Sequence, residues 1–226
     1  MYYADMPQLR TSVACPFGES LQKYWEKRYE YFSKFDEGIQ IDAEGFYSVI
    51  PEQVGLHQAE LIQGATVLDG FAGVGGSAIA FARAGKRVTA VDINGERLKM
   101  AEHNATIYGV QNAITFLHGN FFKIAPTVKT DTVNLDPQWG GPTYKELGRF
   151  LLEHFSPDGN QLLEFSLQHF NEVALRVPTI FDMSELDRFK TPYTAHDDIS
   201  NGRIISRTVV LRKTLILTPH ISRDAG

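Results

Sequence analysis

Residues 136–144 combine groups that could hold and orient a flat base. They read Asp-Pro-Gln-Trp-Gly-Gly-Pro-Thr-Tyr and follow the apolar run 132–135. Pro137 has no backbone N–H, so the predicted strand must end at Asp136. Open α/β sheets bind ligands at the carboxyl ends of their strands, which would place the Asp136 carboxylate beside the aromatic plate of Trp139 at a ligand site. The alternative interpretation is an ordinary strand-to-helix turn with a core tryptophan.

A glycine-rich stretch supplies a second candidate site. Residues 73–78 fit the fingerprint G-x-G-x-x-A, and Asp92 ends the next predicted strand, 19 residues after Gly73. Gly73 and Gly75 would let the backbone approach a ligand, and Asp92 could accept both hydroxyl protons of a ribose. For Asp92 the alternative is a helix cap. The pattern fits both NAD and S-adenosylmethionine (SAM).

Two features favour SAM over NAD. Asp69 lies four residues before Gly73, where a carboxylate could hold the cationic amino-acid end of SAM but would gain nothing from a pyrophosphate. Asn120 and Phe121 follow the third predicted strand and suit the amino edge and the face of an adenine. Asn120 could instead be a simple turn residue.

The elements around these residues predict an α/β fold. Apolar runs at 65–69, 87–92, 114–117, 132–136 and 172–177 alternate with helical stretches, which predicts a Rossmann-like, doubly wound, mostly parallel sheet. Strands at 203–206 and 208–218 would close it with an antiparallel hairpin, an arrangement typical of methyltransferases. We expect an N-terminal arm and helical lid over 1–63 and a methyltransferase domain over 64–226.

The N-terminal region would form the lid. Leu21, Tyr24, Trp25, Arg28 and Phe32 recur at spacings of three and four, which predicts one amphipathic helix with an aromatic face. The face could simply pack on the main domain, or it could close over a ligand. An extended segment is expected at 46–50, and helices are expected at 51–63 and 144–154.

Composition narrows the possible functions. The chain has 226 residues, one cysteine and a net charge of −5, which argues against a broad electrostatic grip on nucleic acid. No apolar run approaches the ~18 residues of a membrane span, and no signal peptide is apparent. The seven histidines make no tight metal spacing, so we assign no metal. We expect an intracellular monomer, in the cytoplasm or the nucleus.

The acid-Pro-x-aromatic loop suits methyl transfer to an amine. An exocyclic amine on a base is a poor nucleophile because its lone pair is delocalised into the ring. The Asp136 side chain and the Pro137 carbonyl could accept its protons and orient it, so that catalysis comes mainly from positioning and electrostatics.

Together these motifs resemble the trimethylguanosine synthase family, the RNA cap guanine-N2 methyltransferases. The resemblance rests on Trp139-Gly140-Gly141-Pro142-x-Tyr144 and on Asp69-x-Phe71-x-Gly73-Val74-Gly75-Gly76, and it extends to the segments 23–39, 44–52, 104–109 and 156–159. It covers most of the chain, from about 23 to 178.

The resemblance implies a substrate and residue roles. The substrate would be 7-methylguanosine, as a nucleotide or at the end of a capped RNA, and the product would be dimethyl- or trimethylguanosine. Trp139 would stack on the cationic 7-methylguanine, gaining about 0.5–2 kcal/mol over the neutral base. The remaining implied contacts are Asn104 and Tyr144 on the substrate, Lys23, Phe32 and Ser48 closing over the SAM and the cap, and Asp69 and Asp92 on the SAM.

The chain also departs from the family pattern. The family usually reads Ser-Pro-Pro-Trp where this chain has Asp136-Pro137-Gln138-Trp139, and Ile50 stands where the family has a threonine. Asp136 could strengthen the pull on an N2 amine or could mark a different base. Two alternatives therefore stay open: an amino-methyltransferase acting on another base of RNA or DNA, and a non-catalytic protein that binds a cap or a nucleotide.

Overall fold

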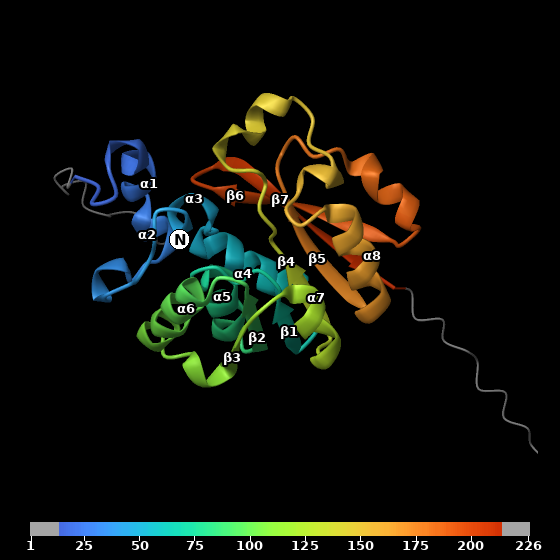
Figure 1. Ribbon diagram of the computed structural model, residues 1–226, viewed down its shortest axis with the longest axis horizontal. Coiled ribbons are helices and arrows are strands. Elements are labelled where there is room, and N and C mark those ends of the chain that lie inside the picture. Colours follow the sequence, from blue (N-terminus) through green and yellow to red (C-terminus); the bar gives the residue numbers. More distant parts are fainter. Residues whose placement is uncertain (1–13, 214–226) are drawn as a thin grey trace, which may run out of the picture.

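The centre of the fold is a seven-stranded sheet, seen in a computed structural model that describes residues 14–213 (Figure 1). The strands are β1 (Thr66–Asp69), β2 (Arg87–Asp92), β3 (Ile114–His118), β4 (Thr132–Leu135), β5 (Glu172–Val177), β6 (Tyr193–Ser200) and β7 (Arg203–Arg212). Their spatial order is β3-β2-β1-β4-β5-β7-β6. β1 to β5 run parallel, while β7 is antiparallel to both β5 and β6. The predicted parallel sheet with an antiparallel C-terminal hairpin is confirmed.

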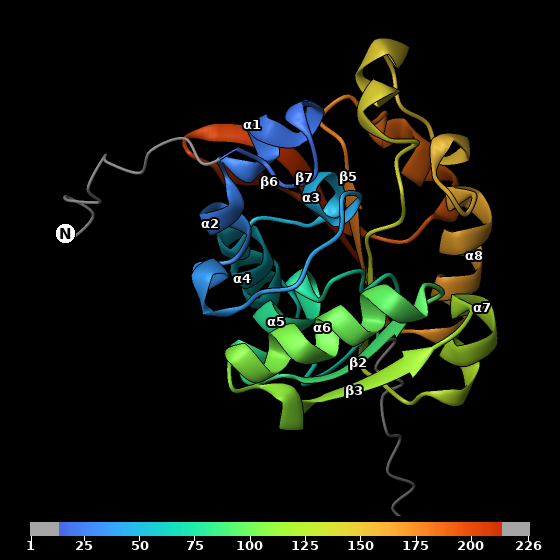
Figure 2. The ribbon, with the colours of Figure 1, turned by 60° about the vertical axis from the view of Figure 1, so that its left-hand side comes forward.

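Helices cover both faces of the sheet (Figures 1 and 2). On one face lie α4 (Glu52–Leu61), α5 (Gly76–Arg83) and α6 (Gly95–Ile107), and on the other lie α7 (Phe121–Ile124) and α8 (Gly159–His169). Strand alternation explains the two cores: Val67 packs among α4–α6, whereas its neighbour Leu68 packs with the α7–α8 side.

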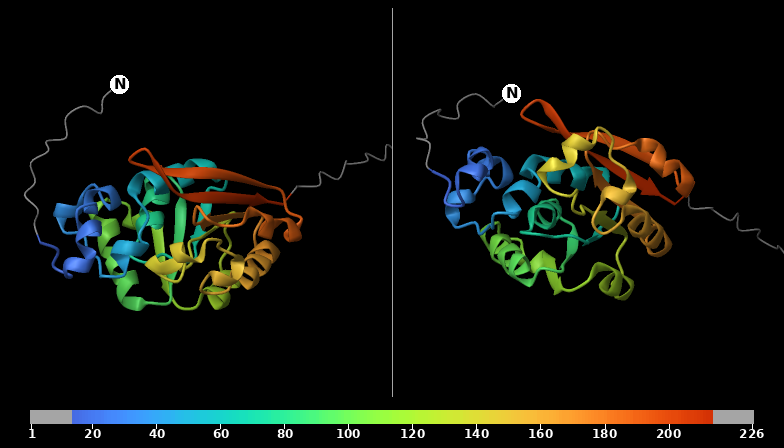
Figure 3. Two further views of the ribbon diagram at one scale, coloured as in Figure 1. Left: turned by 90° about the horizontal axis from the view of Figure 1, so that it is seen from above. Right: turned by 45° about the horizontal axis from the view of Figure 1, so that its top comes forward.

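Short helical elements make up the rest. They are η1 (Glu19–Leu21), α1 (Gln22–Trp25), α2 (Arg28–Tyr31), η2 (Phe35–Glu37), α3 (Gly45–Ser48), η3 (Gln111–Ala113), η4 (Ala125–Thr127), η5 (Pro142–Leu147), η6 (Leu152–His154) and η7 (Met183–Phe189). Figure 3 shows the N-terminal elements, in blue, at the end of the sheet where the β6–β7 hairpin turns. Within the described part of the chain, no helix has the length and apolar character needed to cross a bilayer.

The predicted hairpin has the wrong boundaries. Residues 203–212 form one strand, and its partner β6 lies upstream, joined to it at Asn201 and Gly202. Both turn residues have positive φ (49° and 71°), as the tight turns of hairpins require. The rest of the strand expected at 208–218, residues 214–218, lies outside the described residues.

Three expected elements of other kinds also differ. The single helix over 21–32 is broken into η1, α1 and α2, and the guanidinium of Arg28 donates to the carbonyl of Trp25 at the break (2.8 Å). The extended segment at 46–50 is wrong: α3 forms there, opened by a bond from the Gly45 N–H to Asp42 Oδ1 (2.7 Å). The helix at 144–154 is instead two 3₁₀ turns, separated where Phe150 bridges to Phe181.

Candidate active site

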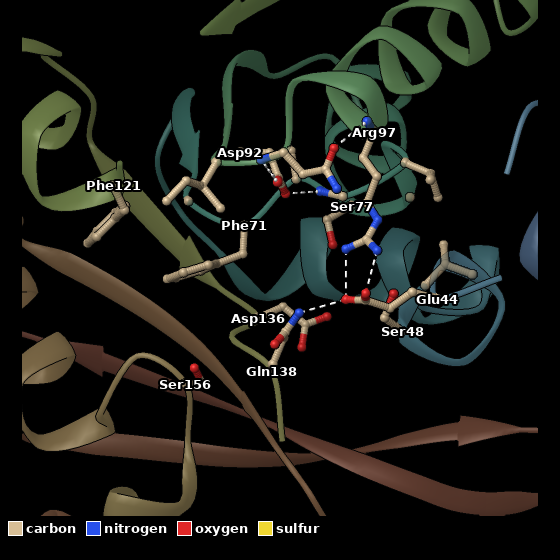
Figure 4. A pocket seen from close by; sticks show the side chains of 18 of the residues that line it. Glu44, Ser48, Phe71, Ser77, Asp92, Arg97, Phe121, Asp136, Gln138 and Ser156 are labelled. Atoms are coloured by element: carbon tan, nitrogen blue, oxygen red, sulfur yellow. Dashed lines mark hydrogen bonds and ion pairs between the residues drawn. The ribbon is translucent and has the colours of Figure 1, made fainter. Parts of the chain in front are cut away.

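The glycine loop between β1 and α5 forms the floor of a cavity of about 540 Å³ (Figure 4). Gly73 (φ 52°) and Gly75 (φ 96°) adopt left-handed backbone conformations that favour glycine. Gly73 lines the cavity, whereas Gly75 caps α5 and packs so closely on Ala101 that a Cβ would lie 3.0 Å from it. Of these two predicted cofactor residues, only Gly73 reaches the cavity.

Asp92 lies at the carboxyl end of β2 and lines the same cavity. Its Oδ2 accepts from the Gly73 N–H (2.7 Å) and its Oδ1 from the Asn94 N–H (2.8 Å). The N-cap of α6 is Asn94, not Asp92. Asp92 therefore ties the glycine loop to β2, and each oxygen keeps a lone pair that could accept from a ligand hydroxyl.

An aromatic side bounds the cavity beyond β3. Asn120 accepts from the Phe122 N–H (2.9 Å) and caps α7, which leaves its side-chain NH₂ without a hydrogen bond to another described residue. Phe71 and Phe121 stack with centroids 5.5 Å apart and an interplanar angle of 29°. Asn120, Phe121, Phe71 and Phe122 all line the cavity. The sequence predicted the first two as cofactor residues and missed the other two. A carboxylate, an amide and flat rings are a set that fits an adenosine.

Asp69 does not line this cavity. It is fully buried, and its Oδ1 accepts from Asn134 Nδ2 (3.0 Å). Burial raises its pKa to about 7, opposed in part by the hydrogen bond from Asn134. Asp69 is therefore buried outside the cavity lining, and its contact with a cofactor stays a prediction.

The substrate loop after β4 lines a second hollow, a cleft of about 850 Å³. The cleft contains Asp136, Pro137, Trp139 and Tyr144, so the structure brings these four predicted residues together. Cleft and cavity share the residues Glu44, Ser48, Val49, Asp136 and Gln138. The two hollows thus adjoin at the end of β4, with Asp136 between them.

Arg176 on β5 is the main residue of the cleft that the prediction missed. Its Nη1 donates to Asp136 Oδ2 (2.9 Å), and its guanidinium lies over the Trp139 ring, 4.7 Å from the centroid. Burial raises the pKa of Asp136, and the charge and hydrogen bond of Arg176 oppose that rise. The signal in the sequence was a lone arginine within an otherwise apolar strand segment, 173–177.

Tyr144 meets Trp139 edge-on, with centroids 5.3 Å apart and an interplanar angle of 84°. The indole Nε1 is buried and has no hydrogen-bond partner among residues 14–213. Trp139 is therefore fixed by Arg176 on one face and by Tyr144, and it remains part of the cleft wall.

The predicted lid residues divide between the two hollows and the core. Ser48 lines both hollows, whereas Lys23 lines only the substrate cleft, and its contact with a cofactor stays a prediction. Phe32 is only 2% exposed and packs in the core, where its ring centroid lies 6.3 Å from that of Tyr108. Asn104 is also buried: its amide bonds the backbone N–H and carbonyl of Gln40 and the Val74 carbonyl. Neither Phe32 nor Asn104 lines a hollow.

A polar clasp that the prediction missed crosses the boundary between cavity and cleft (Figure 4). Glu44 Oε1 accepts from Gln138 Nε2 (2.6 Å) and from Arg97 Nη1 (2.7 Å). The clasp joins the segment before α3 to the substrate loop and to α6. Proline, the usual family residue at the position of Gln138, could not make this bond.

Charges around the cleft have an uneven arrangement. Exposed cations line it from three separate segments: Lys23, Lys27, Lys145 and Arg203. None of the four forms a salt bridge with any residue between 14 and 213. In that same range no group of three or more His, Cys, Asp or Glu side chains could hold a metal ion.

Comparisons with known proteins agree with one another. A family profile described as RNA cap guanine-N2 methyltransferase matches residues 64–207. Trimethylguanosine synthase of Schizosaccharomyces pombe is 34% identical over 190 residues, covering 79% of this chain and 79% of that protein. Trimethylguanosine synthase of Saccharomyces cerevisiae is 32% identical over 181 residues, covering 74% of this chain and 58% of that protein.

Solved structures show the same fold at low sequence identity. A proposed methyltransferase from Porphyromonas gingivalis W83 superposes with a TM-score of 0.66 at 16% identity, covering 84% of this chain and 48% of that chain. The O-methyltransferase TomG from Streptomyces achromogenes, in complex with SAM, gives a TM-score of 0.51 at 17% identity, covering 87% and 90%.

Proposed function

Because the chain belongs to the RNA cap guanine-N2 methyltransferase family, it is an enzyme that methylates N2 of a cap guanine, and we propose how its two hollows divide that reaction. The cavity at the glycine loop would hold the methyl donor. The cleft at Trp139 would hold the guanine. The observation that carries the proposal is that Asp136 lines both hollows.

The donor that fits the cavity is SAM. Asp92 would accept from the ribose hydroxyls, the free amide NH₂ of Asn120 would donate to the adenine ring, and Phe71 and Phe121 would form the aromatic wall. When bound, SAM supplies an electrophilic methyl group. The negatively charged Asp92 and the glycine backbone need no rearrangement to act, because the loop is already tied to β2.

The base that fits the cleft is 7-methylguanine, as a nucleotide or at the end of a capped RNA. Its positive charge favours stacking on the indole of Trp139 by about 0.5–2 kcal/mol over an uncharged guanine. The exposed cations at the rim of the cleft would face the cap phosphates. The negative charge of the whole chain, −5, is therefore compatible with a local phosphate site.

Asp136 would orient the amine. Its Oδ2 is already bonded to Arg176, which leaves Oδ1 to accept a hydrogen bond from the N2 amine, with the Pro137 carbonyl accepting the second. Glu44 also lines both hollows, but its carboxylate is taken up by Arg97 and Gln138. The gain is in aiming the amine lone pair at the cavity.

Product identification tests this proposal. The enzyme is incubated with isotopically labelled SAM and either 7-methylguanosine triphosphate or GTP, and mass spectrometry and NMR locate and count the new methyl groups. We expect label on N2 of the 7-methylated nucleotide, and Glu96→Gln, an exposed carboxylate on α6, serves as the matched control. Label on another atom, or no label with either nucleotide or a short capped RNA, would contradict the proposal.

The acid at position 136 supports a second candidate, an exocyclic-amine methyltransferase acting on another base. An acid at the first position of the loop suits an adenine or an unmethylated guanine equally well. The same assay with short RNA and DNA oligonucleotides decides between them, because methylated adenine would favour this second function.

A further inference from the structure

Arg176 is part of a buried chain of polar groups that extends away from the cleft. Its Nε donates to Ser206 Oγ (3.1 Å), and Ser206 Oγ donates to Asp198 Oδ2 (2.7 Å). Thr208 Oγ1 donates to Asp198 Oδ1 (2.8 Å). Ser206, Asp198 and Thr208 are 0% exposed, and Asp198 lines neither hollow. Nothing in the amine chemistry described above uses this second carboxylate.

The network places two carboxylates around one guanidinium. Asp136 bonds Arg176 directly, and Asp198 reaches it through the hydroxyl of Ser206. With both acids ionised, the group Asp136–Arg176–Asp198 carries one net negative charge. The guanidinium of Arg176 lies directly against one face of Trp139, so the two carboxylates offset a positive charge that would otherwise repel a positively charged base stacked there. Asp198 is fully buried, where its charge is weakly screened.

Cations predominate at the rim of the cleft, although Glu30 and the Arg97-paired Glu44 also line it. Lys23, Lys27, Lys145 and Arg203 are exposed along its rim. A ligand complementary to this arrangement carries a positive base at the floor and negative phosphates at the rim. A nucleotide with a neutral base would still pair its phosphates with the cations at the rim. It would gain no electrostatic attraction at the floor of the cleft, which is formed by Trp139 and Arg176.

We propose that Asp198 is a specificity-determining positioning residue, which acts through Arg176 to make the floor of the cleft select a positively charged base. The inference rests on the proposed function and adds the source of its charge selectivity. Asp136 has a double role, since it contacts the amine and belongs to the charged group. Asp198 lines neither hollow and acts through its charge and its hydrogen bonds with Ser206 and Thr208, so a substitution that keeps its shape and removes its charge separates the two contributions.

Asp198→Asn tests the proposal, because it removes the charge while keeping the shape. Calorimetry on enzyme saturated with S-adenosylhomocysteine measures the affinities for 7-methylguanosine triphosphate and for GTP. We expect the affinity for the 7-methylated nucleotide to fall about three- to tenfold, the scale of one unit charge at ~10 Å in a partly screened site, and that for GTP to change less than about twofold. Equal losses for both nucleotides, or no loss, would overturn the proposal.

Ser206→Ala is the matched control, because it breaks the hydrogen-bonded link without changing any charge. We expect it to lower kcat modestly through looser orientation of Arg176 and Asp136, while the affinity ratio of the two nucleotides stays near that of the wild type. A fall in the ratio as large as that of Asp198→Asn would show that geometry, not charge, sets the selectivity, and would overturn the proposal.

A salt titration of the wild-type enzyme tests the same point without a substitution. Rim contacts are exposed and are screened by salt, so both nucleotides should lose affinity in parallel between low and high ionic strength. The ratio between them should persist, because the charged group is buried. A ratio that collapses with salt would contradict a buried source. If the wild type shows no preference at all for the 7-methylated nucleotide, the proposed function fails and this inference fails with it. Equal losses in Asp198→Asn, on a wild type that does show the preference, overturn this inference alone.

Discussion

The cofactor cavity and the substrate cleft adjoin, yet they are built in different ways. In the cavity, the polar side chains bond backbone groups close to them in the fold's basic unit: Asp92 holds Gly73 and Asn94, and Asn120 holds Phe122. In the cleft, Arg176 bonds the side chain of Asp136 from a distant segment, and at the boundary with the cavity Glu44 bonds the side chain of Gln138. The cavity is therefore a property of the fold, and the cleft is a property of this particular chain.

This difference has a functional consequence. A cavity held by backbone bonds tolerates substitution around it and suits a ligand shared by many enzymes. A cleft held by ion pairs and polar side-chain contacts is rigid only while every partner is present. Substrate selectivity should accordingly be sensitive to single changes in the cleft, while cofactor affinity should not respond to them.

Asp136→Ala should give the largest effect. Loss of an oriented acceptor for the amine should lower kcat by roughly 100- to 1,000-fold, the scale of removing one preorganised polar stabiliser. SAM affinity should stay within about twofold, since the cavity keeps its own contacts. Single-turnover kinetics and a SAM titration measure the two effects, and a loss of only a few-fold would make Asp136 structural.

Trp139→Ala should give the next largest effect, and on binding more than on chemistry. Stacking of a base on an aromatic ring contributes about 1–3 kcal/mol, so nucleotide affinity should fall about 5- to 150-fold. Trp139→Phe keeps a ring and should recover most of the loss. The role of Trp139 as a stacking plate would be wrong if calorimetry found the alanine variant binding 7-methylguanosine triphosphate as tightly as the wild type.

Asp92→Ala tests the other side of the comparison. It removes both the proposed ribose acceptor and the bond that ties Gly73 to β2, so SAM affinity should fall by about tenfold, the effect of one charge-assisted hydrogen bond of ~1.5 kcal/mol. Nucleotide affinity should be unchanged. Equilibrium binding of SAM measures the first effect, and a loss of nucleotide affinity instead would show that the two hollows are not separable.

Asp69→Asn should have the smallest effect on activity, and its effect on stability should depend on pH. The pKa of Asp69 is about 7 in the folded chain, against an ordinary value of 3.8, so the folded state binds its proton more tightly than the unfolded state. The stability that this proton contributes is complete below pH ~4 and is lost as the pH rises to about 7, at up to about 1.4 kcal/mol per pH unit.

Urea denaturation of the wild type and of Asp69→Asn at several pH values checks this dependence. The variant should gain stability relative to the wild type between pH 5 and 7, with no further gain above pH 7. The Glu96→Gln control, at an exposed acid, should show no such trend. A constant difference between wild type and variant across the range would show that burial does not raise the pKa of Asp69.

The parallel part of the fold was predictable because each strand carries its own signal. The strands at 87–92 and 172–177 match their predicted bounds, since apolar runs ending at an acid or before a proline mark both ends. The hairpin was misplaced because β6 is largely polar and exposed, so its sequence lacks a strand's apolar alternation. The segment 46–50 was misassigned because its aromatic and β-branched residues favour strands, and tertiary contacts override that preference.

The candidate site likewise contains residues that local motifs predict and residues that only long-range contacts reveal. Gly73, Asp92, Asn120 and Phe121 were predicted from local motifs, and all four line the cavity. Arg176 was missed because its partners Asp136 and Ser206 lie 40 and 30 residues away, and no local pattern marks such pairs. Asn104 and Phe32 were expected at a ligand from the resemblance to the family alone, and their burial became visible only with the tertiary structure.

The central claim is that the cleft reads the positive charge of the base while the cavity provides the methyl donor. The most direct test compares kcat/KM for 7-methylguanosine triphosphate with that for GTP, with labelled SAM at saturation. The two nucleotides share the phosphates and differ in the charge of the base. We predict at least about a tenfold preference for the 7-methylated nucleotide, as expected when charge selectivity contributes ~1.4 kcal/mol. Equal values would contradict the account, because they would show that neither Trp139 nor the group Asp136–Arg176–Asp198 distinguishes a positively charged base from a neutral one.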